Sequence, residues 1–448
     1  MNSAAPYLQR PTGSSSDVPS ARTVPLYLWP AIIVVYAAIM PRELTVSIGT
    51  AALFPYRLAL LSALPFLAFQ ALRNPVRLHW IDGLVALVSS WILLSLILHE
   101  SLQQALETGL ALSLDFCLAY LVGRLSIRST SDFRALFLAF LPGLTFIAAV
   151  SLYESVAHQH VLRPLIAELV GLPPPEIHDQ VRFGLYRAAG PFPHPILGGV
   201  MLATLLPVAW LMFDRGWLRT VSVFVAFSMI FTVSTAAILV FLTGAVLMAA
   251  YEVQRRSGIP VWLISGIVAA TLVGLIVAVS ESGLLSFAAR RVSISEASGQ
   301  WRVLIWEFAS QEVARHPLFG IGLRDWERPT WMFTDSIDAH FLLWSVRFGL
   351  PAGGGAFAVI LGSAFYLLRN SRFQSYRARR ISMGVAFSLI AFALSGFTVS
   401  LWEGVACCGL LLCGAAVTIG TPPRQILPIF RPSLDRIQPG IPPVKLAR

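Results

Sequence analysis

The run ALFLAFLPGLTFIAAVSLY at residues 135–153 decides the class of fold, because it contains nineteen consecutive residues without a charge. A helix needs about 20 mainly apolar residues to cross the hydrocarbon core of a bilayer. Similar runs recur along the chain, in which 56% of residues are hydrophobic and 12% are charged. A soluble domain needs more polar surface than this to cover its core. The sequence therefore predicts an all-α polytopic membrane protein.

Ten further apolar runs are candidates for membrane spans. Together with the first, they lie at residues 26–40, 56–72, 81–98, 106–123, 135–153, 196–213, 221–251, 259–280, 341–368, 383–401 and 404–420. The run 221–251 is long enough for one overlong helix or for two short ones. Arginines precede it (Arg215, Arg219) and follow it (Arg255, Arg256). The positive-inside rule places both clusters in the cytoplasm, so we expect two crossings that turn near residues 232–235. The count is then about twelve spans.

The remaining basic clusters indicate the topology. They are Arg73/Arg77, Arg124/Arg128/Arg134, the arginines of 369–380 and Arg424/Arg431, and with twelve spans they all fall on the side of both termini. We therefore expect cytoplasmic termini, with disordered tails at residues 1–24 and 421–448 around a transmembrane catalytic domain at 25–420. Two long polar segments, residues 154–194 and 281–340, then face the opposite side. The short outer loop at 99–107 agrees, because it carries acids and no Lys or Arg.

The net charge of +10 does not indicate a nucleic-acid partner. The basic residues form short clusters beside apolar runs, which is the pattern of membrane topology, and no compact basic domain is visible. The cysteines Cys117, Cys407, Cys408 and Cys413 all lie inside apolar runs. They are typical of small core residues and not of disulfides or metal ligands.

Chemistry is expected in the two polar segments. The first contains YRAAGPFPHP at residues 186–195, where prolines and a glycine fix an irregular backbone just before a span. Arg187 is then held at the mouth of the bundle. Its guanidinium either binds a phosphate or diphosphate through paired hydrogen bonds, or contacts lipid headgroups.

The second polar segment predicts a helix. Trp301, Leu304, Ile305 and Phe308 recur at helical spacing, and His316-Pro317 ends the pattern. Arg302 lies on this helix, which makes it the strongest ligand candidate among the arginines of the segment. The others (Arg290, Arg291, Arg324, Arg328) add to the positive field or form a solvated surface.

Asp338 and His340 stand two residues apart at the entry to a span. They could supply a general base or orient an acceptor hydroxyl. Alternatively, Asp338 caps the following helix and His340 anchors it at the interface. Inside the apolar runs, Asp115, Arg57 and Arg347 are ionisable exceptions. We expect Asp115 to pair with an arginine, in a structural, transport or catalytic role.

Three segments in order resemble the O-antigen ligase and polymerase superfamily of bacterial membrane glycosyltransferases. They are RAAGPFPHP at 187–195, WRVLIW at 301–306 followed by PLFGIG at 317–322, and the segment that ends in GLP at 349–351. The resemblance covers about residues 182–355 and depends on the order, spacing and topology of the segments.

The resemblance implies a GT-C-like, metal-independent enzyme of the bacterial inner membrane that needs no cofactor. Its donor would be a saccharide on undecaprenyl diphosphate. The glycan would pass, at the periplasmic face, to a hydroxyl of another glycan or of lipid A-core, in O-antigen (lipopolysaccharide) or exopolysaccharide biosynthesis. Arg187 and Arg302 would bind the diphosphate, with Arg182 and Arg291 beside them. The chain has no acidic cluster suited to a metal ion.

Two positions depart from the ligase pattern, which has a histidine eleven residues before the glycine that corresponds to Gly349. That position is Asp338 here, and His340 follows. Either Asp338 takes the base or orienting role, or His340 reaches the same point from the next turn. Arg347 stands where many relatives carry an acid. The chain is thus more similar to exopolysaccharide or O-antigen polymerases than to lipid A-core ligases.

Two rival functions remain. A transporter or flippase of lipid-linked oligosaccharide also has many spans and a buried acid, but transporters usually show matching broken helices in two halves, and this sequence shows no such symmetry. A protein O-oligosaccharyltransferase would use the same donor with a Ser or Thr acceptor.

Overall fold

The computed structural model describes residues 24–48, 51–73, 76–177, 180–260, 262–263, 266, 296–332 and 334–421. The longer helices are α1 (Trp29–Ala38), α2 (Pro55–Arg73), α3 (Trp80–His99), α5 (Leu110–Ser126), α6 (Thr130–Ala157), α8 (Pro195–Thr204), α10 (Trp217–Phe227), α11 (Thr235–Ser257), α14 (Glu296–Arg315), α16 (Leu350–Ser371), α17 (Tyr376–Ser395) and α18 (Glu403–Gly420). Shorter helices are η1 (Leu26–Leu28), η2 (Arg42–Leu44), α4 (Leu102–Gln104), η3 (Ala105–Gly109), α7 (Leu162–Leu169), α9 (Leu206–Met212), η4 (Ser228–Thr232) and α15 (His340–Phe348). Two antiparallel hairpins complete the fold, β1 (Val46–Ile48) with β2 (Ala51–Leu53) and β3 (Val181–Arg182) with β4 (Leu185–Tyr186).

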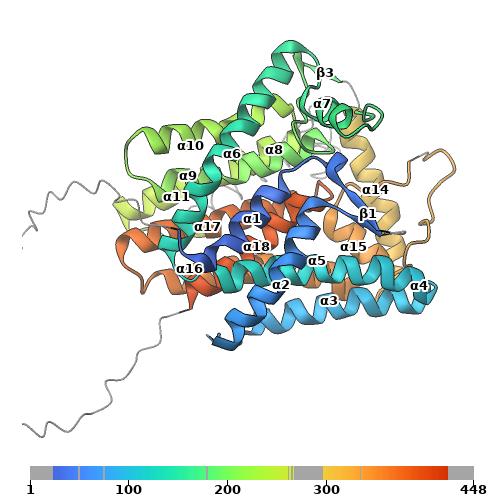
Figure 1. The fold of residues 1–448 in the computed structure, drawn as a ribbon, viewed down its shortest axis with the longest axis horizontal. Helices are drawn as coiled ribbons and strands as arrows, with labels where there is room; N and C mark the ends of the chain where they lie inside the picture. Colours follow the sequence, from blue (N-terminus) through green and yellow to red (C-terminus); the bar gives the residue numbers. More distant parts are fainter. Residues whose placement is uncertain are drawn as a thin grey trace, which may run out of the picture.

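The helices form a bundle whose members run mostly along the long axis of the molecule (Figure 1). Glycines let two of them, α5 and α18, pack backbone to backbone. A Cβ on Gly123 of α5 would lie 1.9 Å from the carbonyl oxygen of Leu411, and one on Gly414 of α18 would lie 2.0 Å from that of Tyr120. Small residues at such crossings are typical of helix packing in membranes.

Nine helical stretches in the described residues are long and apolar enough to cross a membrane, and two shorter apolar stretches lie at Leu26–Ala38 and Trp217–Thr232. The chain is therefore a mostly helical, multi-pass membrane protein, as predicted. Most of the expected span at 259–280 lies outside the described residues, as do the tails at 1–23 and 422–448. The count of twelve and the orientation of the termini stay predictions.

The expected turn inside the run 221–251 is confirmed. Helix η4 ends at Thr232, Val233 adopts φ +43°, and α11 begins at Thr235. The side chain of Ser234 caps α11 by accepting the N–H of Ala237, which ends one helix and starts the next within two residues.

The prediction of one span over residues 341–368 is wrong. The structure breaks this run at Gly349, between α15 and α16. Gly349 has φ +86°, and a Cβ there would lie 1.8 Å from the carbonyl oxygen of Leu318. Pro351 then stands in the first turn of α16, where it favours a helix start. A close tertiary contact thus sets the break.

The predicted helix of the second polar segment is confirmed as α14, which ends at Arg315 before Pro317. Ile305, Ala309 and Val313, four residues apart, belong to an apolar cluster that includes Leu342 of α15. Helix α14, α7 and the hairpin β3–β4 lie at one end of the bundle (Figure 1), which we call the loop end. The opposite end, with the α9–α10 and α16–α17 connections, is called the basic end.

Candidate active site

Arg187 lies in the irregular stretch between the hairpin β3–β4 and α8, and its residue is only 4% exposed. Its Nη1 donates to the side-chain oxygen of Gln180 at 2.7 Å, and its Nε donates to the carbonyl oxygen of Thr232 at 3.2 Å. Both acceptors are neutral. They position the guanidinium without neutralising its charge.

The backbone next to Arg187 is held by Glu154, near the end of α6. This side chain is fully buried, and its Oε2 accepts the N–H groups of Ala189 and Gly190 at 3.1 and 2.9 Å. Its Oε1 accepts the N–H of Val161 at 3.1 Å. A charged acceptor makes strong hydrogen bonds with backbone donors, so Glu154 fixes the loop to the bundle.

Three of the predicted arginines are brought together at the loop end. Arg182 of β3 donates through Nη2 to the same oxygen of Gln180, at 3.3 Å. Burial first, and then the charges of Arg182 and Arg302, lower the pKa of Arg187 to about 10. We call Arg182, Arg187 and Arg302 the arginine cluster. Its members come from both polar segments.

The arginine cluster lacks counter-charges at close range. No carboxylate in the described ranges lies within ion-pair distance of its three members, and the buried Nε of Arg302 has no hydrogen-bond partner. Burial lowers the pKa of Arg302, the charge of Asp338 opposes that shift, and the charge of Arg182 adds to it. Burying a cation without a counter-charge is costly. The cluster therefore suits a multivalent anion.

Asp338 lies in the exposed segment before α15, where its Oδ1 accepts the hydroxyl of Ser336 at 2.9 Å. Asp338 does not cap α15, because the N-cap residue of this helix is Ala339 and no side chain caps it. The capping alternative is therefore wrong. Asp338 is instead the carboxylate whose charge acts on Arg302. The fourth predicted arginine, Arg291, lies outside the described residues.

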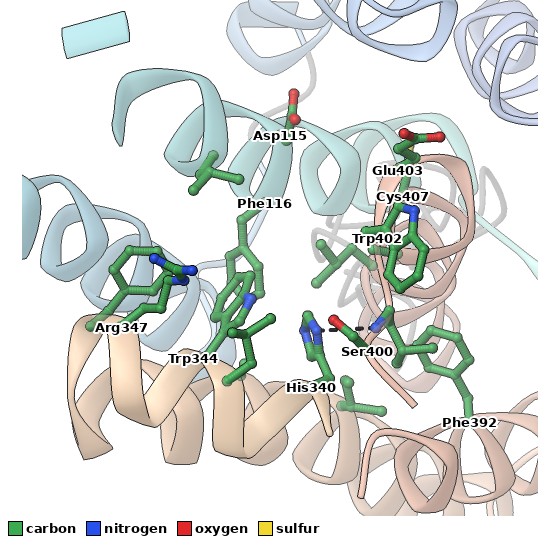
Figure 2. A pocket seen from close by; sticks show the side chains of 18 of the residues that line it. Asp115, Phe116, His340, Trp344, Arg347, Phe392, Ser400, Trp402, Glu403 and Cys407 are labelled. Carbon is green, nitrogen blue, oxygen red and sulfur yellow. Dashed lines mark hydrogen bonds between the residues drawn. The ribbon is translucent and has the colours of Figure 1, made fainter. Parts of the chain in front are cut away.

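His340 faces a cavity of about 290 Å³ between α5, α15 and α18 (Figure 2). The ring lies 4.8 Å from that of Trp344, and its Nδ1 accepts the N–H of Leu401 at 3.4 Å. Burial lowers the pKa of His340 to about 4, so the ring is neutral at physiological pH. With Nδ1 as acceptor, the proton of the neutral ring sits on Nε2. In this tautomer, His340 can donate a hydrogen bond through Nε2.

Asp115 and Arg57 form an ion pair at the side of this cavity. The Nη2 of Arg57 lies 2.6 Å from Oδ2 of Asp115, and the hydroxyl of Tyr56 donates to the same oxygen at 3.0 Å. Arg347, which the sequence grouped with this pair, does not join it. Its Nη1 donates to the carbonyl oxygen of Gly322 at 3.3 Å.

Several residues of the site could not be found from the sequence. Glu154 marked only the start of a loop, and Gln180 and Thr232 had no local signal, since their contacts depend on the fold. Glu403 also lines the cavity (Figure 2). It adopts φ +52° at the first position of α18, a strained conformation for a residue with a side chain. In the described residues, no group of three or more His, Cys, Asp or Glu side chains could hold a metal ion.

Residues 220–357 match a family model described as O-Antigen ligase. The match includes Arg302, Asp338 and His340, whereas Arg182 and Arg187 precede it. A search of curated proteins finds no match to the chain. The family match agrees with the resemblance carried by the two polar segments, and it supports the similarity of this multi-pass membrane protein to the O-antigen ligase and polymerase superfamily.

Proposed function

We propose that the protein is an inner-membrane glycosyltransferase that moves a glycan from undecaprenyl diphosphate to a saccharide hydroxyl at the periplasmic face. One observation carries this proposal: Arg182, Arg187 and Arg302 converge at the loop end, and no carboxylate of the described residues lies at ion-pair distance from them. Guanidinium groups bind phosphate oxygens through paired hydrogen bonds. A diphosphate would supply the missing counter-charge.

The cluster acts on the leaving group. During transfer, the bond between the anomeric carbon and the diphosphate oxygen breaks, and negative charge grows on that oxygen. Donors that are already in place stabilise such charge more than water does, because they need no reorganisation. Gln180 and Thr232 hold Arg187 in advance, and Glu154 holds its loop.

The acceptor side uses Asp338 and His340. A new bond forms between the acceptor oxygen and the anomeric carbon, and the hydroxyl proton passes to the carboxylate of Asp338. Asp338 suits this role because it is exposed and close enough to Arg302 to act on its charge. His340 donates through Nε2 to a sugar oxygen and orients it. The proton goes to Asp338 and not to His340, because Nδ1 of His340 already accepts the N–H of Leu401 and burial lowers the pKa of the ring to about 4.

Alanine substitution tests the proposal. Arg187→Ala and Arg302→Ala should each abolish surface polysaccharide while the protein is still made and inserted. Arg324→Ala is the matched control, because this exposed arginine of the same segment only donates to the carbonyl of Ile321. Wild-type glycan in both cluster variants would refute the proposal.

A banding gel of envelope glycans from the Arg302→Ala strain separates the branches of the superfamily. Single repeat units indicate a lost polymerase. Long chains that remain on the carrier lipid indicate a lost ligase. We expect single repeat units, because Asp338 stands at the position where the ligase pattern has a histidine.

A further inference from the structure

A second cavity, of about 320 Å³, lies at the basic end of the bundle. Its charged lining residues are Arg134, Asp214, Arg215, Arg219, Arg377 and Arg380. Among the described residues of this lining, arginines outnumber the single aspartate. Asp214 is itself paired with Arg380, so it does not neutralise the others.

The walls of this basic cavity come from separate helices. Arg134 belongs to the first turns of α6, Arg219 to α10, and Arg377 and Arg380 to α17. The connection between α9 and α10 closes the cavity between them. An anion bound here would contact several parts of the bundle at once.

The start of α10 adds backbone donors. Its N-cap is Gly216, with φ +143° and no side-chain cap, and its first turn holds no acid. Gly216, Trp217 and Leu218 line the cavity. Free N–H groups at a helix start favour an anion, which adds to the effect of the arginines.

Two exposed tryptophans beside the cavity suit a position at headgroup depth. Trp217 is 71% exposed and Trp210 is 41% exposed, and the guanidinium of Arg219 stacks on Trp210 at 3.4 Å from the ring centroid. Exposed tryptophans of membrane proteins gather at the membrane–water interface. The helices that line the cavity also begin or end here, beside the apolar part of the bundle.

We propose that the basic cavity binds the phosphate of an anionic phospholipid. Basic pockets between membrane helices are suited to lipid headgroups, and several guanidinium groups can bind one phosphate through paired hydrogen bonds. The apolar side chains beside the arginines, among them Leu211, Met212 and Ile381, would contact the start of the acyl chains. The lipid joins α6, α10 and α17, and so stabilises the bundle independently of the loop-end site.

The test measures lipid retention and thermal stability of the purified full-length protein. Phosphatidylglycerol should raise the unfolding temperature of the wild type more than phosphatidylcholine does. Arg134→Gln and Arg215→Gln, both exposed side chains of different elements, should each weaken retention roughly tenfold in native mass spectrometry, since a hydrogen bond to a charged group is lost. Arg256→Gln is the control, because this exposed arginine lies on α11 and does not line the cavity.

Three results would overturn the proposal. The first is equal stabilisation by both lipids, and the second is unchanged phosphatidylglycerol retention in both cavity variants. The third is a full effect of inorganic phosphate alone, which would show a phosphate site without a lipid. Because no donor substrate is used, the outcome does not depend on the proposed glycosyl transfer.

Discussion

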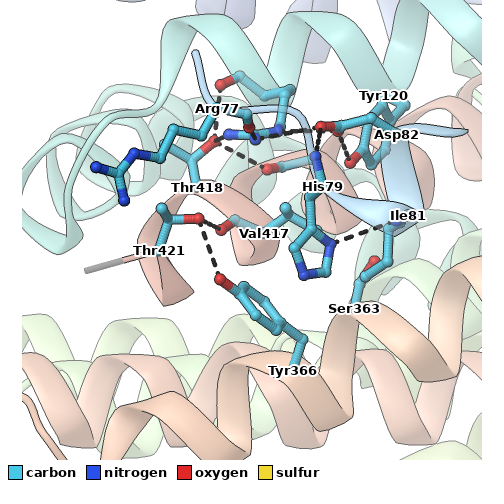
Figure 3. A network of polar contacts seen from close by, with 12 residues as sticks. Arg77, His79, Ile81, Asp82, Tyr120, Ser363, Tyr366, Val417, Thr418 and Thr421 are labelled. Carbon is cyan, nitrogen blue, oxygen red and sulfur yellow. Dashed lines mark hydrogen bonds and ion pairs between the residues drawn. The ribbon is translucent and has the colours of Figure 1, made fainter. Parts of the chain in front are cut away.

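Arg124 in the bundle is buried and Arg302 at the loop end is half-buried with a buried Nε, and the partners of the two side chains differ. The Nε of Arg124 lies 3.0 Å from Oδ1 of Asp82, and its Nη2 donates to the carbonyl of Arg77 at 2.7 Å. Its Nη1 donates to the hydroxyl of Thr418 at 3.0 Å. Figure 3 labels the partners Arg77, Asp82 and Thr418, together with Tyr120, which also donates to Asp82. Every nitrogen of Arg124 has a partner.

The guanidinium nitrogens of the arginine cluster have fewer partners than those of Arg124. Among the described residues, the Nε of Arg302 has no partner, and the printed acceptors of Arg187 are neutral oxygens. Arg57, paired with Asp115, resembles Arg124 and not the cluster. The difference indicates which arginines stabilise the bundle and which are kept available for a ligand. Charge and burial alone do not separate the two kinds, whereas the partners do.

We expect the largest loss in the free energy of unfolding when the hydrogen bonds around Arg124 are broken. Asp82→Ala leaves a buried guanidinium without its counter-charge, which should lower the free energy of unfolding by about 3–5 kcal/mol. Thr418→Val, which removes one neutral partner, should cost about 1 kcal/mol. Chemical unfolding in detergent measures both. A loss for Asp82→Ala no larger than that for Thr418→Val would contradict the structural role of the pair.

Arg302→Ala should lower transfer activity and leave the stability of the bundle unchanged. Transfer activity should fall roughly 10²–10³-fold, as for other preorganised donors to a developing charge. The free energy of unfolding should not fall, because the half-buried cation that is removed has no hydrogen-bonded carboxylate among the described residues. Activity is measured with a lipid-diphosphate donor, and stability as above. A destabilisation as large as that of Asp82→Ala would place Arg302 with the structural arginines.

Asp338→Asn tests whether Asp338 accepts the proton or only positions Arg302, as Asp82 positions Arg124. If Asp338 is the proton acceptor, Asp338→Asn should lower the transfer rate about 10²-fold. The affinity for the donor and the free energy of unfolding should not change. Measuring the rate constant and the Michaelis constant separately resolves this. If only the Michaelis constant for the donor changes, Asp338 positions Arg302 and takes no proton.

The smallest expected effect is the change of the transfer rate with pH. Because burial lowers the pKa of His340 to about 4, the ring stays neutral as the pH falls from 8 to about 5 and gains a proton only near 4. The pH–rate profile should therefore show no histidine step between pH 5 and 8. A step near 6.5 that disappears in His340→Gln would show that the ring titrates in its ordinary range.

The sequence predicted features that depend on local patterns. The turn after Thr232 followed from arginines on both sides of an overlong run, and the end of α14 followed from Pro317. The role proposed for Arg187 and Arg302 followed from the resemblance, and the structure brings both to the loop end with Arg182.

Other features depend on contacts between distant residues and could not be predicted. The break at Gly349 results from its close approach to Leu318. Glu154 binds residues 35 and 36 positions away, and Gln180 joins two arginines of its own loop. The pairing of Asp115 with Arg57 and not with Arg347 depends on how α2, α5 and α15 pack.

Donor binding tests the central claim most directly. Calorimetric titration of the purified protein with a short-chain prenyl diphosphate should give an affinity that Arg187→Ala and Arg302→Ala each weaken about tenfold or more, since charge-assisted hydrogen bonds are lost. Arg324→Ala should bind as the wild type does. Unchanged affinity in both cluster variants would contradict the account, because the arginine cluster would then have no diphosphate to hold.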